Sequence, residues 1–405
     1  MITIRSLGGS GEDSRNCFLI SFNEKSILLD CGVRREIAET ERVYPLLNKD
    51  IVSKIDAVYL SHCHEDHSAS LPYLYHLGYK GYVYASKETI DLSPSYISKW
   101  QDYVLTNNGT LPFNKEDTDR IQFKEIDNNS PYLIKYGRSG HVLGGLWYLF
   151  EIEEKKILYT GDICYDGLLL ETDPLPKADV LIIDSAYASR HLSQNKQYQQ
   201  LLDTIRQTIS NNATALLPIP AQGRGIDMYL YLRQYDLPIL LEEAVLTAAD
   251  KLSKQNKWLK STDLFDYNSS STVLVNDKNR NDLDLSGKII ITPDGMMTNT
   301  KALYYFDRLK DNKLNKVIIT GHSAIGTLAH SIQNKDYRDQ NSINLDVQSI
   351  TIKVHLDYDD VLKTINVVKP EKVMLFHSKK KDSDKLKEAM ESEGITVINS
   401  INNAL

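Results

Sequence analysis

Short, unbroken runs of apolar residues recur along this chain and restrict the folds that it can adopt. The runs are rich in branched side chains and lack the apolar–polar alternation of a sheet with one face in water. Such runs are typical of strands that are buried on both faces because helices cover their sheet. Clear examples occupy residues 57–60, 146–150, 156–159 and 180–183. These runs predict an α/β fold.

The pattern of elements changes near residue 191 and returns near residue 347. The middle part is expected to form a second α/β unit, with helices at 193–211, 224–235 and 242–258 and strands at 213–220, 288–292 and 316–320. The last part is expected to rejoin the first unit, with strands at 349–354, 372–376 and 395–398 and helices at 359–368 and 382–393. We therefore predict one domain made of residues 1–190 and 347–405, interrupted by a second domain at 191–346.

Composition excludes several classes of protein. Hydrophobic residues make up 41% and charged residues 25% of the 405 positions, which is ordinary for a globular enzyme and excludes a disordered chain. The 47 basic and 54 acidic residues give a net charge of −7, which excludes a uniformly basic surface for nucleic acid but leaves room for a local basic groove. No apolar run of about 18 residues exists to cross a membrane.

Cysteine usage indicates a reducing compartment. Cys17, Cys31, Cys63 and Cys164 are scattered and form no Cys-x-x-Cys pair. We interpret them as reduced core thiols. Because residues 1–16 also lack the apolar segment of a signal peptide, we expect a cytoplasmic protein.

Two features of the composition leave their role open. The chain has 24 tyrosines against 8 phenylalanines, and tyrosine serves cores, interfaces and base-stacking platforms alike. Lys251, Lys254, Lys257 and Lys260 repeat at three-residue spacing, which on a helix would place them on one side. A solvated helix face is the ordinary interpretation of such a lysine run.

The segment that follows the apolar run 57–60 carries a dense group of metal-ligand side chains. His62, His64, Asp66 and His67 lie within six residues, although the whole chain has only 10 histidines. In an extended chain, residues two apart point the same way, so His62 and His64 should converge. We expect a helix to begin at Ser68, just beyond them. Four such side chains can hold one or two metal ions of the zinc type.

Further ligand candidates stand at the ends of other apolar runs. His141 follows Gly140, Asp162 follows Gly161, and His377 directly follows the expected strand at 372–376. A single strand-end histidine or aspartate usually has an ordinary hydrogen-bonding role. Three of them at strand ends, in a chain that also has the first cluster, indicate one metal centre built from distant segments.

These motifs resemble those of the metallo-β-lactamase superfamily: His-x-His-x-Asp-His at 62–67, then Gly140-His141, then Thr160-Gly161-Asp162. Other segments resemble its β-CASP branch, the nucleases related to ribonuclease J and to the cleavage-and-polyadenylation endonuclease. They are residues 7–12 with Asn16, 29–32, 159–162, 184–187, 220–225, 294–297, 321–328, 354–358 and 376–378. The resemblance implies an αββα sandwich with an inserted α/β β-CASP domain.

The resemblance also implies which residues act. Seven side chains would hold two zinc ions, with manganese as the alternative: His62, His64 and His141 for one ion, Asp66, His67 and His377 for the other, and Asp162 for both. Asp30 would orient a metal ligand. His355, backed by Asp184, would donate a proton to the leaving oxygen, and Asp66 would be a further catalytic residue. Substrate phosphate would contact Arg224, His322, Gly326 and Thr327, where glycine-containing turns offer free N–H groups.

The expected function is therefore hydrolysis of phosphodiester bonds in single-stranded RNA, by a hydroxide that two zinc ions hold. The enzyme would act as an endonuclease or as a 5′-exonuclease. It would work alone, as a homodimer or in a larger complex.

Two alternatives stay open. One is another hydrolase on the same site, acting on DNA, a small phosphodiester or a lactone. The other is a non-catalytic RNA-binding subunit.

Overall fold

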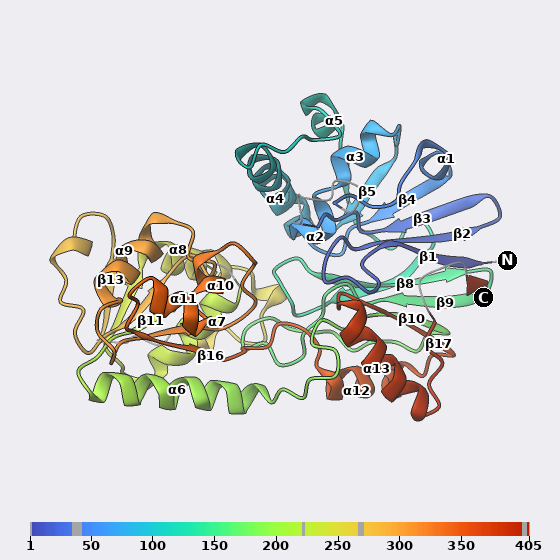
Figure 1. Cartoon of the computed structure of the whole chain (residues 1–405). Coiled ribbons are helices and arrows are strands. Elements are labelled where there is room, and N and C mark those ends of the chain that lie inside the picture. The colour runs from blue at the N-terminus through green and yellow to red at the C-terminus, as the bar shows by residue number, and fades with distance from the viewer. Residues whose placement is uncertain (1, 35–42, 221–222, 266–270, 399–402, 405) are drawn as a thin grey trace. The chain divides into compact units, whose positions relative to one another are not determined.

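The computed structural model describes residues 2–34, 43–220, 223–265, 271–398 and 403–404. These residues form two compact units, which are drawn in Figure 1 and described one at a time. Unit 1 comprises Met1–Tyr165, Glu171–His191 and His355–Leu405. Unit 2 comprises Asp166–Leu170 and Leu192–Val354, and so extends beyond the predicted boundary at residue 346.

The first sheet of unit 1 has seven strands in the order β18-β1-β2-β3-β4-β5-β6. From β18 to β3 the neighbours are antiparallel, and from β3 to β6 they are parallel. The strands are β1 (Thr3–Gly8), β2 (Cys17–Phe22), β3 (Lys25–Leu29), β4 (Ile55–Tyr59), β5 (Tyr82–Ala85), β6 (Gln122–Glu125) and β18 (Asn403–Ala404).

The second sheet of unit 1 has five strands in the order β17-β10-β9-β8-β7. Here β7, β8 and β9 are antiparallel, whereas β9, β10 and β17 run parallel. The strands are β7 (Leu133–Arg138), β8 (Leu146–Ile152), β9 (Lys155–Tyr159), β10 (Val180–Asp184) and β17 (Lys372–Phe376). Every residue of β10 is buried, as its unbroken apolar sequence predicts.

Aromatic side chains fill the space between the two sheets. The ring of Phe18 lies 5.8 Å from that of Tyr159 and 5.3 Å from that of Phe376. Tyr59 of β4 meets Phe150 of β8 at 4.8 Å. Rings of this size bury a large apolar area at such contacts, so they hold the two sheets together.

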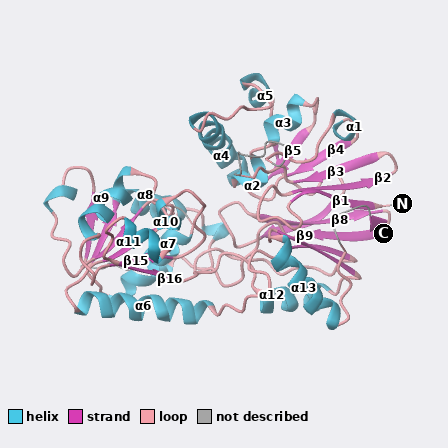
Figure 2. Cartoon of the chain, in the orientation of Figure 1, coloured by secondary structure: helices cyan, strands magenta, loops and turns pink. Residues whose placement is uncertain are grey.

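Helices cover the outer face of each sheet in unit 1 (Figures 1 and 2). On the first sheet, Leu28 and Val58 share a core with Leu71 and Leu74 of α3. On the second sheet, Leu181 shares a core with residues of α12 and α13. The helices are α1 (Lys49–Val52), α2 (Glu65–Ser68), α3 (Leu71–His76), α4 (Lys87–Thr106), α5 (Lys115–Asp119), α12 (Tyr358–Val368) and α13 (Lys380–Ser392). The resulting αββα order confirms the expected layering.

Unit 2 contains a parallel sheet of six strands in the order β13-β12-β14-β11-β15-β16. The strands are β11 (Ala215–Pro218), β12 (Ile239–Glu242), β13 (Thr272–Val275), β14 (Ile289–Thr292), β15 (Lys316–Ile319) and β16 (Asp346–Ser349). The α-helices are α6 (Gln194–Ser210), α7 (Arg224–Leu232), α8 (Glu243–Leu252), α9 (Thr300–Leu309), α10 (Leu328–Ser331) and α11 (Lys335–Gln340). Short 3₁₀ turns are η2 (Arg233–Tyr235), η3 (Asn256–Trp258), η4 (Asp263–Phe265) and η5 (Arg280–Asp282).

Three expected elements differ from the structure. The strand predicted at 349–354 is wrong, because the edge strand β16 ends at Ser349 and Lys353 then donates its N–H to the Gln194 side chain. The strand predicted at 395–398 is reduced to one bridge, between Val373 and Val397. The helix predicted at 242–258 ends at Leu252, so its four lysines do not share one helix face. The chain continues into η3, where the side chain of Trp258 is buried.

None of the helices in the described part of the chain combines the length and the apolar composition that a bilayer crossing needs.

Candidate metal centre

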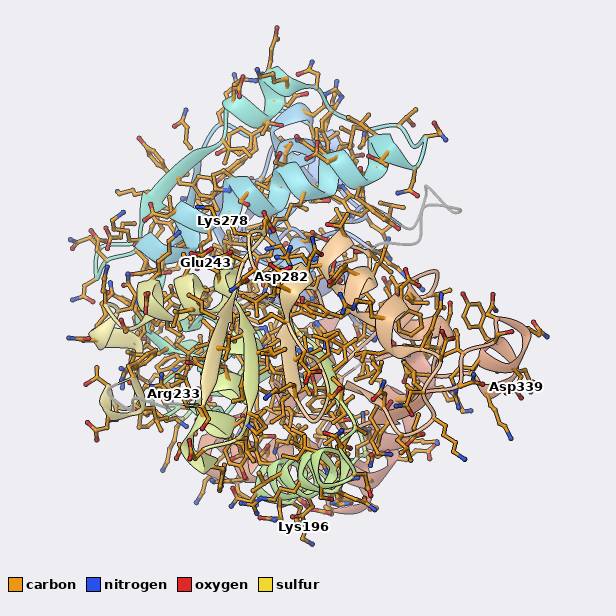
Figure 3. All side chains as sticks on the ribbon, turned by 90° about the vertical axis from the view of Figure 1, so that its left-hand side faces the viewer. Lys196, Arg233, Glu243, Lys278, Asp282 and Asp339 are labelled. Carbon is orange, nitrogen blue, oxygen red and sulfur yellow. The ribbon has the colours of Figure 1, made fainter. Side chains whose placement is uncertain are left out.

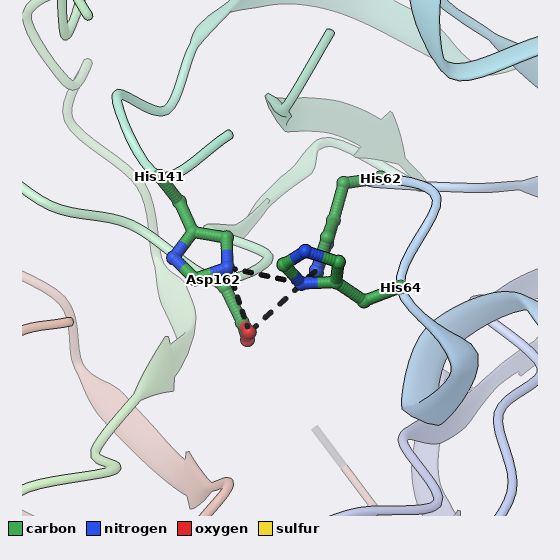
Figure 4. A group of neighbouring side chains, drawn as sticks. All are labelled: His62, His64, His141 and Asp162. Atoms are coloured by element: carbon green, nitrogen blue, oxygen red, sulfur yellow. Dashed lines mark hydrogen bonds and ion pairs between the residues drawn. The ribbon is translucent and has the colours of Figure 1, made fainter. Parts of the chain in front are cut away.

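The first ligand group lies where the chain leaves β4 in an extended conformation. His62 Nε2 is 3.0 Å from His64 Nδ1, so the expected convergence of these rings is present. His141 Nε2 is 3.2 Å from the same His64 atom (Figure 4). Asp162 Oδ2 lies 3.6 Å from the Nε2 atoms of both His62 and His141. Three imidazole nitrogens and a carboxylate oxygen therefore surround one point.

Glycines allow the loop of His141 to pack closely against its neighbours. This loop joins β7 to β8, and Gly140 and Gly144 adopt φ angles of +71° and +88° within it. A Cβ atom on Gly140 would lie 2.0 Å from Thr172 Oγ1, and one on Gly144 would lie 2.7 Å from the Thr89 nitrogen. Side chains cannot be accommodated at either position, so these glycines bring His141 to the site.

The second ligand group combines α2 with the ends of β9 and β17. His377 Nε2 is 3.0 Å from Asp66 Oδ2 and 3.5 Å from Asp162 Oδ2. His67 Nε2 is 3.2 Å from Asp162 Oδ1 and 3.6 Å from Asp66 Oδ2. Asp162 is thus common to the two groups, and both groups consist of the residue types that bind divalent ions.

The helix at this group begins earlier than the sequence indicates. We expected its start at Ser68, but α2 spans Glu65–Ser68. The carbonyl of His64 accepts hydrogen bonds from the N–H groups of His67 at 3.0 Å and Ser68 at 2.9 Å. Asp66 and His67 therefore lie within the helical turn, which explains why adjacent residues can both face the same group.

Asp30 fixes the orientation of His67. Its Oδ2 atom lies 2.6 Å from His67 Nδ1, while Ser61 donates its N–H to Oδ1 at 2.6 Å and its hydroxyl to Oδ2 at 2.7 Å. Tyr159 donates a fourth hydrogen bond to this fully buried carboxylate. With Nδ1 held by Asp30, the Nε2 atom of His67 is directed to the ligand group.

Two ligand-associated residues have a left-handed backbone. Asp30 has φ +56° and His377 has φ +66°, and neither is glycine. Such conformations cost free energy and persist where the surrounding structure enforces them. The N–H of His377 donates to the Gly9 carbonyl at 3.0 Å, which helps to hold the residue in this conformation.

Burial and charge set the protonation of the group. Burial lowers the pKa of His64 to about 4, so this ring is neutral at pH 7 and its lone pair is available to an ion. Burial also acts to lower the pKa of His377, but Asp162 and Asp66 outweigh it and raise that pKa to about 10. Burial acts to raise the pKa of Asp162, yet His377 and His67 hold it well below its usual range. The two carboxylates thus attract a cation to this place.

The donor set fits a divalent ion such as zinc. Tetrahedral coordination with zinc–nitrogen bonds of about 2.05 Å separates neighbouring nitrogens by roughly 3.3 Å. The nitrogen–nitrogen distances of 3.0 and 3.2 Å in the first group are close to that separation. The ligand atoms of each group lie within 4.8 Å of one another.

His355 and Asp184 lie beside the two groups. His355 Nδ1 is 2.9 Å from Asp184 Oδ2 and 3.8 Å from Asp162 Oδ2. The His355 ring centre is 4.7 Å from that of His141 and 4.9 Å from that of His377. Asp184 ends the buried strand β10 and is fully buried. The side chain of His355 is 14% exposed, so a substrate can reach it.

The expected phosphate contacts all belong to unit 2. Arg224 begins α7, and its guanidinium lies so close to Gly321 that a Cβ there would be 2.1 Å from Nη1. His322 and Gly326 follow β15 in the same loop, and Gly326 has φ +86° with open space around it. Thr327 caps α10 by accepting the N–H of His330 at 3.3 Å. The structure thus brings Arg224 to the 321–327 loop, whereas the metal-ligand residues belong to unit 1.

Sequence reasoning gave no role at the site to two residues that contact it. Ser61 donates twice to Asp30, and Asn16, named only within the N-terminal motif, has its Nδ2 atom 2.8 Å from His67 Nε2. Ser61 directly precedes His62, but a serine before a histidine motif carries no ligand signal of its own. Only the pairing of distant strands brings these polar groups together.

Three family models match this chain. The metallo-beta-lactamase superfamily model matches residues 10–209, the beta-Casp domain model matches 181–332, and the Zn-dependent metallo-hydrolase RNA specificity domain model matches 341–400. Together they account for most of the sequence.

Several proteins are similar in sequence. Transcription termination factor FttA from Methanothermobacter thermautotrophicus is 27% identical over 92% of this chain and 66% of its own length. An RNase J-like protein from Methanocaldococcus jannaschii is 28% identical, over 95% of this chain and 94% of its own. Cleavage and polyadenylation specificity factor subunit 3 from Dictyostelium discoideum is 26% identical, over 98% and 56%. The chain therefore spans less than two thirds of the first and third of these relatives.

A solved structure shares the fold. The crystal structure of a protein of unknown function from Enterococcus faecalis V583 superposes with a TM-score of 0.56 and 15% identity. The match covers 94% of this chain and 95% of that one.

Proposed function

This chain belongs to the metallo-β-lactamase superfamily and its β-CASP branch, and on that premise we propose that it is a metal-dependent ribonuclease. It hydrolyses phosphodiester bonds of single-stranded RNA. One observation carries the proposal: two His/Asp ligand groups share Asp162, and a histidine–aspartate pair lies beside them. Residues 191–346 are its β-CASP domain.

Two zinc ions are the proposed cofactor. His62, His64 and His141 would hold one ion, Asp66, His67 and His377 would hold the other, and Asp162 would serve both. The many imidazole ligands favour zinc, and manganese is the alternative. When bound, such an ion pair activates water and neutralises charge on the phosphate.

The side chains around the ions supply the rest of the chemistry. His355 protonates the leaving 3′-oxygen from the ring nitrogen that does not face Asp184. Asp184 holds the tautomer and stabilises the charged ring. Asp66 acts within the ligand group and positions the attacking water. Its Oδ2 atom lies 3.0 Å from His377 Nε2. Arg224, His322, Gly326 and Thr327 are the proposed phosphate contacts.

RNA is the proposed substrate for two reasons. The match over residues 341–400 is to a domain described by RNA specificity, and similar proteins are named RNase J-like protein and endoribonuclease.

The test is a cleavage assay on labelled linear RNA, circular RNA, single-stranded DNA and a chromogenic phosphodiester, with and without chelator. We expect metal-dependent RNA cleavage with 5′-phosphate and 3′-hydroxyl ends. Cleavage of circular RNA identifies an endonuclease, and its absence with linear cleavage identifies an exonuclease. Cleavage of DNA alone supports another hydrolase on this site. RNA binding without cleavage in zinc- and manganese-loaded protein overturns the proposal in favour of a non-catalytic subunit.

A further inference from the structure

Unit 2 contains a cavity of about 390 Å³, and the described residues that line it include none of the proposed metal ligands or phosphate contacts. Its wall is formed by the segment 166–168, the first two turns of α6, Tyr231 of α7 and Lys260. This volume lies at the lower end of the range for small-molecule sites, about 300–1,000 Å³. The cavity is open to solvent, so a ligand needs no rearrangement to enter.

Two tyrosines in tilted ring contact form one side of the cavity. The ring centres of Tyr198 and Tyr231 are 4.4 Å apart with an interplanar angle of 33°. Tyr198 is 5% exposed, and Tyr231 is partly exposed. Tyr235 contacts Tyr231 from the next turn, with ring centres 5.3 Å apart. This side accounts for part of the tyrosine excess in the sequence, and a rigid aromatic surface of this kind suits base stacking.

Carboxamides stand beside the aromatic side. Asn195 and Gln199 are four residues apart on α6 and flank Tyr198, so the three side chains share one face of the helix. Each carboxamide offers both a donor and an acceptor. Gln199 donates from Nε2 to Asp203 at 2.8 Å. The edge of a nucleobase also presents donors and acceptors, which the Asn195 carboxamide and the Gln199 oxygen can match.

The charges in the cavity suit a single phosphate rather than a polyanion. Lys260 donates from Nζ to the Gly167 carbonyl at 2.7 Å and remains exposed to solvent. Among the described residues of the wall, Asp166 is the one acid, and Lys353 pairs with it through Nζ at 2.8 Å. The Lys353 side chain is 2% exposed, so this pair offsets the acid from within the protein.

We propose that this cavity binds one nucleotide, with its base against the Tyr198–Tyr231 side, its polar edge at Asn195 and Gln199, and its phosphate near Lys260. The nucleotide is either one residue of a bound RNA strand or a free mononucleotide. The site does not use the metal centre, so it stands or fails separately from the proposed ribonuclease activity.

The test measures binding by the 405-residue chain in the presence of a chelator, which keeps the RNA intact. The probes are a fluorescent single-stranded RNA and, separately, UMP and AMP. We expect Tyr231→Ala to weaken binding about 5-fold or more and Tyr231→Phe to retain it, because stacking needs the ring and not the hydroxyl. Lys260→Ala should weaken binding less and reduce its salt dependence. Lys196→Ala is the matched control. Lys196 lies on α6, as Tyr198 does, and its side chain points away from unit 2 (Figure 3).

A photocrosslink gives a second measurement that does not depend on variants. RNA carrying 5-iodouridine should crosslink to the peptides that contain Tyr198 or Tyr231.

Because Tyr231 also packs on Tyr198, the unfolding temperature of each variant is measured. Asn195→Ala, at an exposed position, replaces Tyr231→Ala if the latter unfolds. Tight UMP or AMP binding with the same variant pattern assigns a free nucleotide. Unchanged binding in Tyr231→Ala and Asn195→Ala, with crosslinks only elsewhere, overturns the proposal.

Discussion

His355 Nδ1 lies 2.9 Å from Asp184 Oδ2, and this carboxylate is fully buried at the end of β10. The other oxygen of Asp184 accepts the N–H of Ala186 at 2.9 Å. Because both oxygens are held, the carboxylate cannot turn away, and it fixes the side of the ring that faces the protein. The opposite ring nitrogen is then the one that can give a proton to substrate.

Replacement of His355 should separate chemistry from metal binding. We expect His355→Ala to lower kcat about 10²- to 10⁴-fold, the usual contribution of a general acid, with metal content unchanged. His191→Ala is the matched control, because His191 is exposed and pairs with Asp359 on the surface. Single-turnover RNA cleavage and elemental analysis check both expectations. Full activity of a metal-loaded His355→Ala protein would exclude His355 as the proton donor.

Replacement of the shared carboxylate should have a larger effect on metal content than replacement of a ligand in one group. Asp162 lies 3.6 Å from His141 and 3.2 Å from His67, which belong to different groups. Asp162→Ala should therefore lose both ions, and His141→Ala mainly one. Elemental analysis of the purified variants measures this directly. Equal metal content in Asp162→Ala and His141→Ala would contradict a shared ligand.

Metal should also stabilise the folded chain. An ion that binds only the folded state raises the free energy of unfolding by mass action. Zinc added to chelator-treated protein should raise the unfolding temperature of the wild type and leave that of Asp162→Ala nearly unchanged. Thermal unfolding at a series of zinc concentrations makes the comparison. An equal rise in both proteins would locate the stabilising ion elsewhere.

A buried ion pair in unit 2 should be important for stability. Glu242 is fully buried, and Arg280 contacts its two oxygens at 2.7 and 2.9 Å while Tyr305 donates at 2.7 Å. Glu242→Ala leaves Arg280 without this partner and should cost about 3–5 kcal/mol of unfolding free energy. Glu243→Ala, at the neighbouring exposed position labelled in Figure 3, should change it little. Urea unfolding of the two variants provides the test.

Asp227 should make stability depend on pH in the direction opposite to most carboxylates. Burial raises its pKa to about 6, although the Leu168 N–H donates to it at 3.1 Å. In the unfolded chain an aspartate has a pKa of about 3.9, so between these values the folded state binds more protons. This group therefore adds stability as pH falls from about 7 to about 4.

Asp227→Asn removes that dependence while keeping an acceptor for the Leu168 N–H. The variant should be more stable than the wild type at pH 7, and the difference should shrink as pH falls through 6 toward 4. Unfolding temperatures of both proteins over this range measure the difference. A gap that stays constant with pH would show that Asp227 is not the titrating group.

Much of the fold could be predicted from the sequence. The apolar runs at 57–60, 156–159 and 180–183 correspond to β4, β9 and β10, because a short run of branched residues without alternation is typical of a sheet covered on both faces. The helix expected at 359–368 is α12, which begins one residue earlier with a capping box between Asp357 and Asp360. The strand predicted at 349–354 was wrong and the one at 395–398 is reduced to a single bridge, since local β-propensity cannot tell how far a segment stays paired with its neighbour.

The candidate site shows the same division. The sequence by itself determined which side chains are ligand types and that His62 and His64 point the same way, because both follow from residue identity and strand geometry. The family resemblance implied that Asp162 serves both ligand groups and that Asp30 orients a ligand, but only the tertiary structure showed the contacts themselves, that the ligand held by Asp30 is His67, and that Tyr198 contacts Tyr231. Those contacts join residues far apart in the chain, so they depend on sheet order, on strand register and on the backbone angles of Asp30 and His377, none of which local sequence encodes.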